Sequence, residues 1–435
     1  MRRLERWYDA CRVIVSGLLL MIAFGCIAGT LTREKTLSEA ERRIEQYRKG
    51  EIRLTLVDAE GKTLPAGTEV RIEQANHAFL FGCNIFMFSR CRTPKENELY
   101  QQRFKDLFNY ATLDFYWGGY EPQQGKTRVG RQKELARWCR ANSITTKGHP
   151  LFWTREPQWV GKLPEKEGQA LLFGRIGREV KDFAVLVDIW DVVNEPGIKK
   201  GRERNAVALV QAYETLGIIG TIQKAFDVAK KANPQATLIL NEYDLGTYEE
   251  TITKSLKQGV PIDVIGIQSH MHSGVWWPKE TWDVCERFAR FGKPLHFTEV
   301  TILSGTGKWR AWTKTNPRDE KRQAKEIVEF YTILFSHPAV EAITWWDLSD
   351  QGAWEGAPVG LIREDMSPKP AYEQLRRLIK EKWWTKETVV TDSKGKAALR
   401  GFYGDYKLST KIGNKTINKT FRLEKGVEEK RILLD

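Results

Sequence analysis

The chain of 435 residues holds only six cysteines, and their spacing argues against a zinc site. They are Cys11, Cys26, Cys83, Cys91, Cys139 and Cys285. None has a partner in a Cys-x-x-Cys pair, the usual arrangement around structural zinc. A Cys83–Cys91 disulfide is one interpretation of the spacing, but we favour buried free thiols, which pack as small apolar groups. We therefore expect no metal at these positions.

The sequence also lacks a long basic block and any nucleic-acid-binding motif. The formal net charge is +13, but the 69 Lys and Arg residues are spread along the chain among 56 acidic residues. Nucleic-acid recognition needs basic residues gathered on one face. We therefore expect no nucleic-acid partner, and we interpret the excess charge as solvated surface, which helps near acidic cell-wall polymers.

The first thirty residues form a segment of their own. Four arginines precede an apolar run over 13–31. This pattern is typical of a secretory signal peptide, and its length also suits a single membrane anchor. Cys26 follows Ala23-Phe24-Gly25, an imperfect lipoprotein cleavage box. All three readings predict export, to a secreted, periplasmic or membrane-anchored location with attachment through residues 1–31.

Three further segments follow the N-terminal one. A helix-prone stretch and an alternating strand pattern, EIRLTLVD at 51–58, predict an N-terminal β-rich unit over 32–76. The main domain spans 77–382, and a Thr-, Lys- and Gly-rich C-terminal β-rich unit covers 383–435. We expect the C-terminal unit to pack with the N-terminal one.

The main domain alternates short apolar runs with longer segments of helical period. No glycine-rich phosphate loop follows the first run, which argues against a dinucleotide-binding sheet. Continuous apolar strands suit a parallel sheet covered by helices, and eight strand–helix units in about 300 residues favour an α/β fold, the closed (β/α)8 TIM barrel. The runs occupy 77–86, 108–117, 145–153, 185–195, 236–244, 263–272, 294–302 and 342–349.

Polar and aromatic residues gather at the carboxyl ends of these runs. In a barrel all such ends open onto one face, where active sites are built. A buried strand has little reason to end on a carboxylate unless that end faces a cleft. The residues are His149, Trp153, Asn194, Glu195, Asn241, Glu242, Gln268, His270, Glu299 and Trp346.

Two of these residues, Glu195 and Glu299, predict a chemistry. They end the fourth and seventh runs, which lie on opposite sides of a barrel mouth. Glycoside hydrolysis needs one carboxylic acid to protonate the leaving oxygen and one carboxylate across the anomeric carbon. A carboxyl separation of about 5–5.5 Å predicts a retaining mechanism. The alternative is that either glutamate is a surface carboxylate beside a helix.

Longer motifs around these residues carry a family resemblance. The segments WDVVNEP (190–196), PIDVIGIQSHMH (261–272) and FTEVTI (297–302) resemble glycoside hydrolase family 10, the endo-β-1,4-xylanase family. KGHPLFW (147–153) and AITWWDLSDQGAW (342–354) extend the resemblance, which covers about residues 77–382 in the expected order.

The resemblance implies a role for each matching residue. Glu195 matches the acid/base and Glu299 the nucleophile of a retaining, endo-1,4-β-xylanase-like hydrolase acting on xylan or a related plant polysaccharide. His270 resembles the histidine that orients the nucleophile, and Asn194 the donor to the sugar 2-hydroxyl. Further substrate contacts are expected from His149, Trp153, Gln268, Trp346 and Trp354. Such chemistry needs no metal or organic cofactor, and we expect a monomer.

One stretch departs from the family pattern. Where members carry Glu-Asn-x-x-Lys-Trp, Leu113 and Tyr116 replace the Asn and Lys that bind glycone sugars, although Trp117 is kept. Thr154 stands where a second histidine often follows the Trp. The departure predicts altered binding on that side: another β-glycan, a decorated xylan or short oligosaccharides. It also leaves open a non-catalytic carbohydrate-binding barrel.

Overall fold

The structure is a computed structural model that describes residues 32–197 and 206–435. The segment for which the sequence predicts an export signal, 1–31, lies outside the described residues. Within the described ranges, no helix combines the length and apolar character needed to cross a bilayer.

Eight parallel strands close into a barrel, as the alternating runs predict. The strand order is β12-β3-β4-β5-β6-β7-β8-β9, and β12 pairs with both β9 and β3 to close the ring. Each strand falls within or beside one of the eight apolar runs. Their bounds are β3 Leu80–Asn84, β4 Tyr110–Asp114, β5 Thr145–His149, β6 Ile189–Asn194, β7 Thr237–Glu242, β8 Val264–Met271, β9 Leu295–Ile302 and β12 Val340–Trp345.

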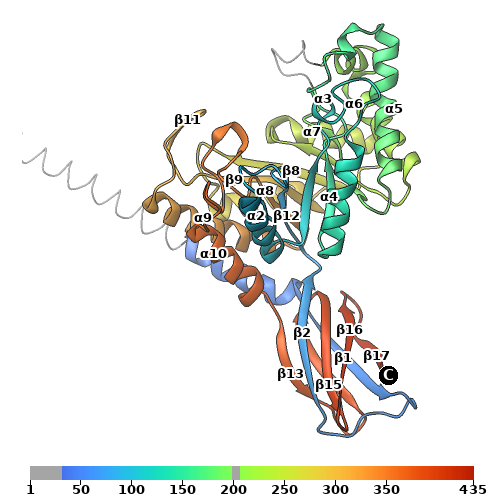
Figure 1. Cartoon of the computed structure of the whole chain (residues 1–435), viewed down its shortest axis with the longest axis vertical. Helices are drawn as coiled ribbons and strands as arrows, with labels where there is room; N and C mark the ends of the chain where they lie inside the picture. Colours follow the sequence, from blue (N-terminus) through green and yellow to red (C-terminus); the bar gives the residue numbers. More distant parts are fainter. Residues whose placement is uncertain (1–31, 198–205) are drawn as a thin grey trace, which may run out of the picture.

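Helices cover the outside of the barrel, and shorter ones lie in the loops that follow its strands (Figure 1). They are α2 Pro94–Leu107, α3 Trp117–Tyr120, α4 Val129–Ala141, η1 Val160–Lys162, α5 Glu165–Asp182, α6 Val207–Ala232, α7 Leu245–Lys257, α8 Pro278–Ala289, α9 Pro317–Ser336, η3 Trp354–Gly356, α10 Pro370–Arg377 and η4 Leu378–Lys382. Local sequence sets where several begin. Thr93 and Glu96 form a capping box at α2, and Asn316 caps α9 ahead of a proline at its first position.

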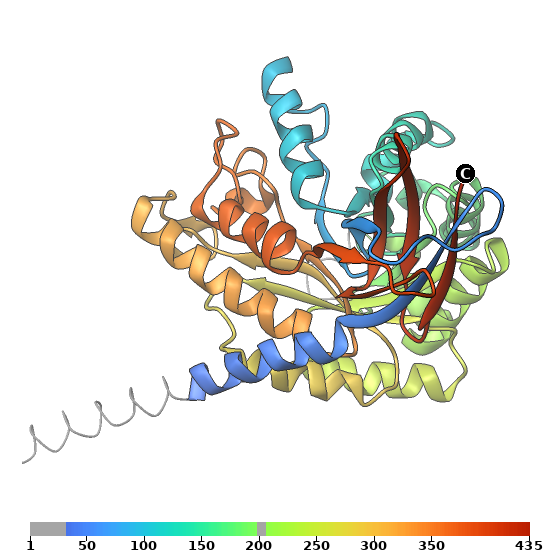
Figure 2. The ribbon, with the colours of Figure 1, turned by 90° about the horizontal axis from the view of Figure 1, so that it is seen from below.

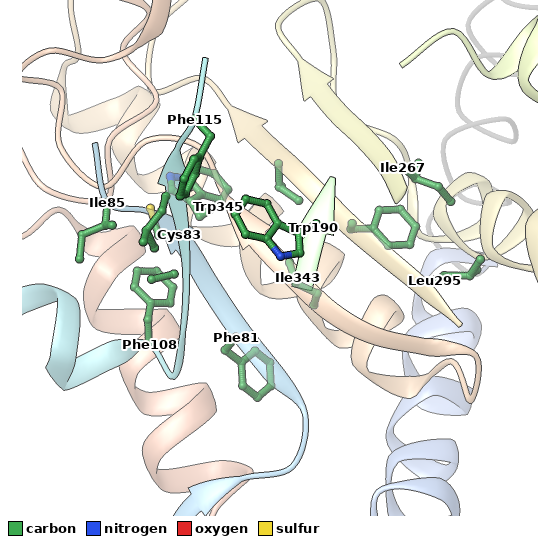
Figure 3. Close-up of a cluster of buried hydrophobic side chains, with 14 of the residues drawn as sticks. Phe81, Cys83, Ile85, Phe108, Phe115, Trp190, Ile267, Leu295, Ile343 and Trp345 are labelled. Atoms are coloured by element: carbon green, nitrogen blue, oxygen red, sulfur yellow. The ribbon is translucent and has the colours of Figure 1, made fainter. Parts of the chain in front are cut away.

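Large apolar side chains of the strands pack between the barrel and the helices that cover it (Figure 3). Trp190 and Trp345 are fully buried, and each indole N–H donates to a backbone carbonyl, of Val187 at 3.0 Å and Val359 at 3.1 Å. Gly148 is required beside Trp190, because a Cβ there would lie 2.1 Å from the indole ring. This packing fixes the strands whose ends carry the predicted site.

The strands before and after the barrel pair with one another in a β-sandwich (Figure 2). One sheet has the order β14-β1-β17 and the other β13-β2-β15-β16. Apolar side chains of both sheets form a core separate from that of the barrel. The strands are β1 Lys49–Asp58, β2 Glu69–His77, β13 Lys386–Val390, β14 Lys396–Phe402, β15 Gly404–Ile412, β16 Lys415–Leu423 and β17 Glu429–Leu434.

A helix over 32–47 and the residue that follows it join the sandwich to the barrel. The Arg48 guanidinium donates to the carbonyls of Phe335, His337 and Val340 at the foot of the barrel. The chain enters the barrel from β2 at the amino end of β3. The sandwich therefore lies at the end opposite the strands' carboxyl ends.

The four cysteines of the described residues are free, which confirms the prediction of buried thiols over a disulfide. Cys83, Cys139 and Cys285 are buried, and Cys91 is half-buried.

Candidate active site

A cavity of about 640 Å³ opens where the carboxyl ends of the barrel strands meet. Two of its lining residues, Trp309 and Arg310, come from the short hairpin of β10 (Gly307–Lys308) and β11 (Ala311–Trp312). Of the nine site residues that the sequence predicts, all but His149 line the cavity. These eight are Trp153, Asn194, Glu195, Gln268, His270, Glu299, Trp346 and Trp354.

Glu299 is buried on β9 and held by two donors. Its Oε1 accepts from Asn241 Nδ2 at 2.8 Å, and its Oε2 lies 3.0 Å from His270 Nε2. Burial alone would raise the pKa of this carboxyl, but His149 and His270 outweigh it and hold the pKa of Glu299 below its ordinary value. The lowered pKa favours the ionised carboxylate.

Glu195 follows β6 directly, and its backbone is unusual. Its φ is +52°, in the left-handed region that residues other than glycine rarely adopt. The backbone N–H of Glu195 donates to Asn241 O at 2.8 Å, and its side-chain Oε1 lies 3.5 Å from Gln268 Nε2. Such strained positions concentrate at functional sites. Here the turn places the Glu195 carboxyl in the same cavity as Glu299.

Asn241, at the end of β7, hydrogen-bonds both to Glu299 and to Asn194, the residue before Glu195. Its Nδ2 donates to Asn194 Oδ1 at 2.7 Å as well as to Glu299, and its Oδ1 accepts from Thr298 at 2.6 Å. Asn194 Oδ1 also accepts from Gln268 at 3.1 Å. The Asn194 amide oxygen is thus fully engaged, and its N–H groups are left to donate into the cavity.

A buried chain of charged and polar groups lies behind the cavity wall. Asp191 Oδ2 is 2.7 Å from both Lys147 Nζ and His149 Nδ1, and His149 Nε2 is 3.0 Å from the Tyr116 hydroxyl. Burial would raise the pKa of Asp191, but Lys147 and His149 keep it below its ordinary value. His149 is itself fully buried, and its Nε2 lies 3.9 Å from Glu299 Oε1. It therefore influences the cavity through its contacts with Tyr116 and Glu299.

Aromatic side chains form much of the cavity wall. The Trp354 ring stacks on His270 with centroids 4.8 Å apart, and Trp346 meets His149 edge to face at 5.3 Å. Trp153 packs at 5.2 Å from Tyr116. Flat aromatic faces of this kind suit sugar rings.

The positions that depart from the family pattern have different surroundings. Leu113 is fully buried in the barrel core, so it makes no contact in the cavity. Tyr116 and Thr154 both line the cavity. From the sequence, Asn241 is predicted only as a polar strand end and Tyr116 only as a substitution, and no role is predicted for Lys147, Asp191, Trp309 or Arg310. The position of Asn241 at a strand end and the residue type of Tyr116 are the sequence features that could have indicated their roles in the cavity.

Among the described residues, no group of three or more His, Cys, Asp or Glu side chains is arranged to hold a metal ion. The cavity lining carries carboxyl, amide, imidazole, phenol and guanidinium groups.

A (β/α)8 barrel with two glutamates in one aromatic-walled cavity has the groups that glycoside hydrolysis requires, and the class of protein is a glycoside hydrolase. The model of glycosyl hydrolase family 10 matches residues 73–378, and the chain belongs to that family.

Curated relatives and solved structures agree with this membership. Endo-1,4-beta-xylanase B of Thermotoga neapolitana is 29% identical over 66% of this chain and 84% of its own length. Anti-sigma-I factor RsgI6 of Acetivibrio thermocellus is 25% identical over 90% of this chain, which spans only 49% of that protein. The structure of xylanase 10B from Thermotoga maritima matches with a TM-score of 0.60 and 26% identity, covering 70% of this chain and 96% of that one.

Proposed function

We propose that the protein is a retaining, endo-1,4-β-xylanase-like hydrolase that cleaves xylan or a related β-1,4-linked plant polysaccharide. The observation that carries the proposal is the shared cavity, in which Glu299 at β9 is kept ionised by His149 and His270 while Glu195 enters from the end of β6. The xylanase names of several relatives support the choice of polymer.

The two glutamates would act in two steps. Glu195 donates a proton to the glycosidic oxygen while the Glu299 carboxylate attacks the anomeric carbon, which gives a glycosyl-enzyme and releases the rest of the chain with a new hydroxyl at its non-reducing end. Glu195 then removes a proton from water, the water oxygen attacks the same carbon, and Glu299 leaves as a carboxylate. Two inversions give net retention.

The neighbouring side chains would support these steps. The His270 hydrogen bond orients the Glu299 oxygen that does not bind Asn241. Asn194 can donate to the 2-hydroxyl of the sugar under attack, a contact that strengthens in the transition state. We also propose export, on the pattern of residues 1–31, and a monomeric state.

The test is a comparison of Glu195→Ala and Glu299→Ala on two substrates. On xylan both variants should lose at least about a thousandfold in kcat/KM, because each lacks a group of the reaction. On an aryl xylobioside with an acidic phenol leaving group, Glu195→Ala should keep a rapid first-turnover burst of phenol, since that group needs no proton, followed by slow turnover because no base activates water. Glu299→Ala should stay inactive.

Glu60→Ala, at an exposed turn of the sandwich, is the matched control and should behave as wild type. Full turnover of xylan by Glu299→Ala would refute the proposal. Binding of xylan without any hydrolysis by wild type would instead indicate a carbohydrate-binding barrel.

A further inference from the structure

Arg155 is a cation at the cavity that the proposed reaction does not use. It lies six residues after the end of β5, beside the part of the wall formed by Tyr116, Trp153 and Thr154. Its side chain is exposed, and its guanidinium carbon lies 5.4 Å from the centre of the Trp153 ring. A guanidinium beside an aromatic ring keeps its N–H groups available to a ligand.

The backbone around Arg155 is fixed from two sides. Gly118 N donates to Arg155 O at 3.1 Å. The next residue, Glu156, accepts from Ala208 N at 3.0 Å and Leu209 N at 2.8 Å, at the start of α6. The charge is thus presented to the cavity from a rigid segment, as recognition requires.

The other charged groups of the cavity wall already have partners. Arg310 binds Glu355 with two hydrogen bonds, of 2.6 and 2.8 Å, and Glu299 is held by Asn241 and His270. Arg155, in contrast, has no carboxylate within ion-pair distance among the residues that the structure describes. The charge of Arg155 still acts on another residue of the cavity wall. The pKa of Glu355 is held below its ordinary value by the hydrogen bond from Arg310 and, to a smaller degree, by the charge of Arg155.

We propose that Arg155 binds the carboxylate of an acidic sugar, and that the enzyme therefore prefers β-1,4-linked chains bearing uronic-acid substituents. The planar fork of a guanidinium matches a carboxylate, to which it can donate two parallel hydrogen bonds. The hydroxyl groups of an undecorated chain offer no such partner. This inference rests on the proposed function and names the substrate class of the same cavity.

The test compares one xylo-oligosaccharide carrying a single glucuronic acid with the same molecule after reduction of its carboxyl group to an alcohol. The measured quantity is the ratio of kcat/KM on the acidic to that on the reduced substrate, which cancels any general effect of a substitution. Wild type should show a ratio well above one that falls as salt is added. Arg155→Gln should lower the ratio by about five- to twentyfold.

Arg155→Lys keeps the charge without the fork, so its ratio should lie between those of wild type and Arg155→Gln. Arg137→Gln, at an exposed arginine of α4, is the matched control and should keep the wild-type ratio. A wild-type ratio near one, or an unchanged ratio in Arg155→Gln, would overturn the inference.

A binding measurement separates this inference from the proposed function. In the Glu195→Gln background, calorimetry should give a lower Kd for the acidic than for the reduced oligosaccharide, and Arg155→Gln should remove the difference. Failure of wild type to cleave either oligosaccharide would refute the proposed function, and the two Kd values would still decide whether Arg155 binds a carboxylate.

Discussion

At the scale of single residues, the site depends on amide groups whose orientation is dictated by their neighbours. Asn241 Oδ1 receives the Thr298 hydroxyl, so its Nδ2 must face Asn194 and Glu299. The Asn194 oxygen therefore accepts from Asn241, and the Asn194 N–H groups are left to donate into the cavity. One buried amide therefore sets the positions of the Glu299 carboxylate and of the Asn194 amide beside Glu195.

This arrangement predicts that Asn241→Ala lowers kcat by about ten- to a hundredfold, because Glu299 loses a hydrogen bond and Asn194 loses its fixed orientation. Thr298→Val removes only the donor that orients Asn241, so it should cost about three- to tenfold. Steady-state kinetics on one oligosaccharide, with thermal unfolding as a check on folding, would measure both. Equal kcat values in wild type and Asn241→Ala would contradict the orienting role.

The His270–Glu299 hydrogen bond predicts a change in pH dependence. Because His149 and His270 lower the pKa of Glu299, its ionised form is stabilised, and that stabilisation is lost as the pH falls through the folded-state pKa. His270→Ala removes part of it and raises the pKa of Glu299. The acid limb of the kcat/KM profile, measured from pH 3 to 8, should then move to higher pH. An unmoved limb would show that Glu299 does not set it.

At the scale of elements, the strands were predictable because each barrel strand is buried on both faces and reads as a continuous apolar run. Glu195 and Glu299 were predictable because the ends of such runs share one face. The turn at Glu195 was not, because it depends on a shift of register between β6 and β7, which sequence periodicity does not show. The buried position of His149 behind Tyr116 also depends on tertiary packing.

The start of α6 predicts another pH effect. Its N-cap, Ala206, has no side-chain acceptor, so Glu156 accepts from the first N–H groups instead. Burial raises the pKa of Glu156 to about 7. Because the folded-state pKa of Glu156 is raised, its protonated form stabilises the fold. That stabilisation is fully present at pH values below the ordinary carboxyl pKa and is lost as the pH rises through about 7.

Glu156→Gln does not titrate, so it should gain stability relative to wild type by about 1–3 kcal/mol between pH 4.5 and 8. Urea unfolding at several pH values would measure the difference. Glu165→Gln, at an exposed residue of α5, should show no such trend. A constant difference between wild type and Glu156→Gln would contradict the raised pKa.

At the scale of the whole molecule, the barrel is inserted between the strands of the sandwich. β2 leads directly into β3, and the chain returns from η4 to β13, which pairs with β2. His77 Nε2 lies 3.1 Å from Ile379 O at this junction. The N- and C-terminal β units, which the sequence predicts to pack together, thus form one sandwich whose sheets each combine strands of both units, a pairing that sequence periodicity does not show.

Because the sandwich has its own core, we expect substitutions in it to change the free energy of unfolding without changing kcat. Leu54 on β1 is fully buried in the sandwich core, whereas the Arg53 side chain beside it is 70% exposed. Leu54→Asp places a charge in an apolar core and should lower the free energy of unfolding by at least about 3 kcal/mol, or leave the chain insoluble. Arg53→Asp should change it by less than about 0.5 kcal/mol. Because the cavity lies at the opposite end of the barrel, kcat per folded molecule should match wild type in both variants. A large loss of kcat in a folded Leu54→Asp protein would show instead that the sandwich holds the catalytic groups in place.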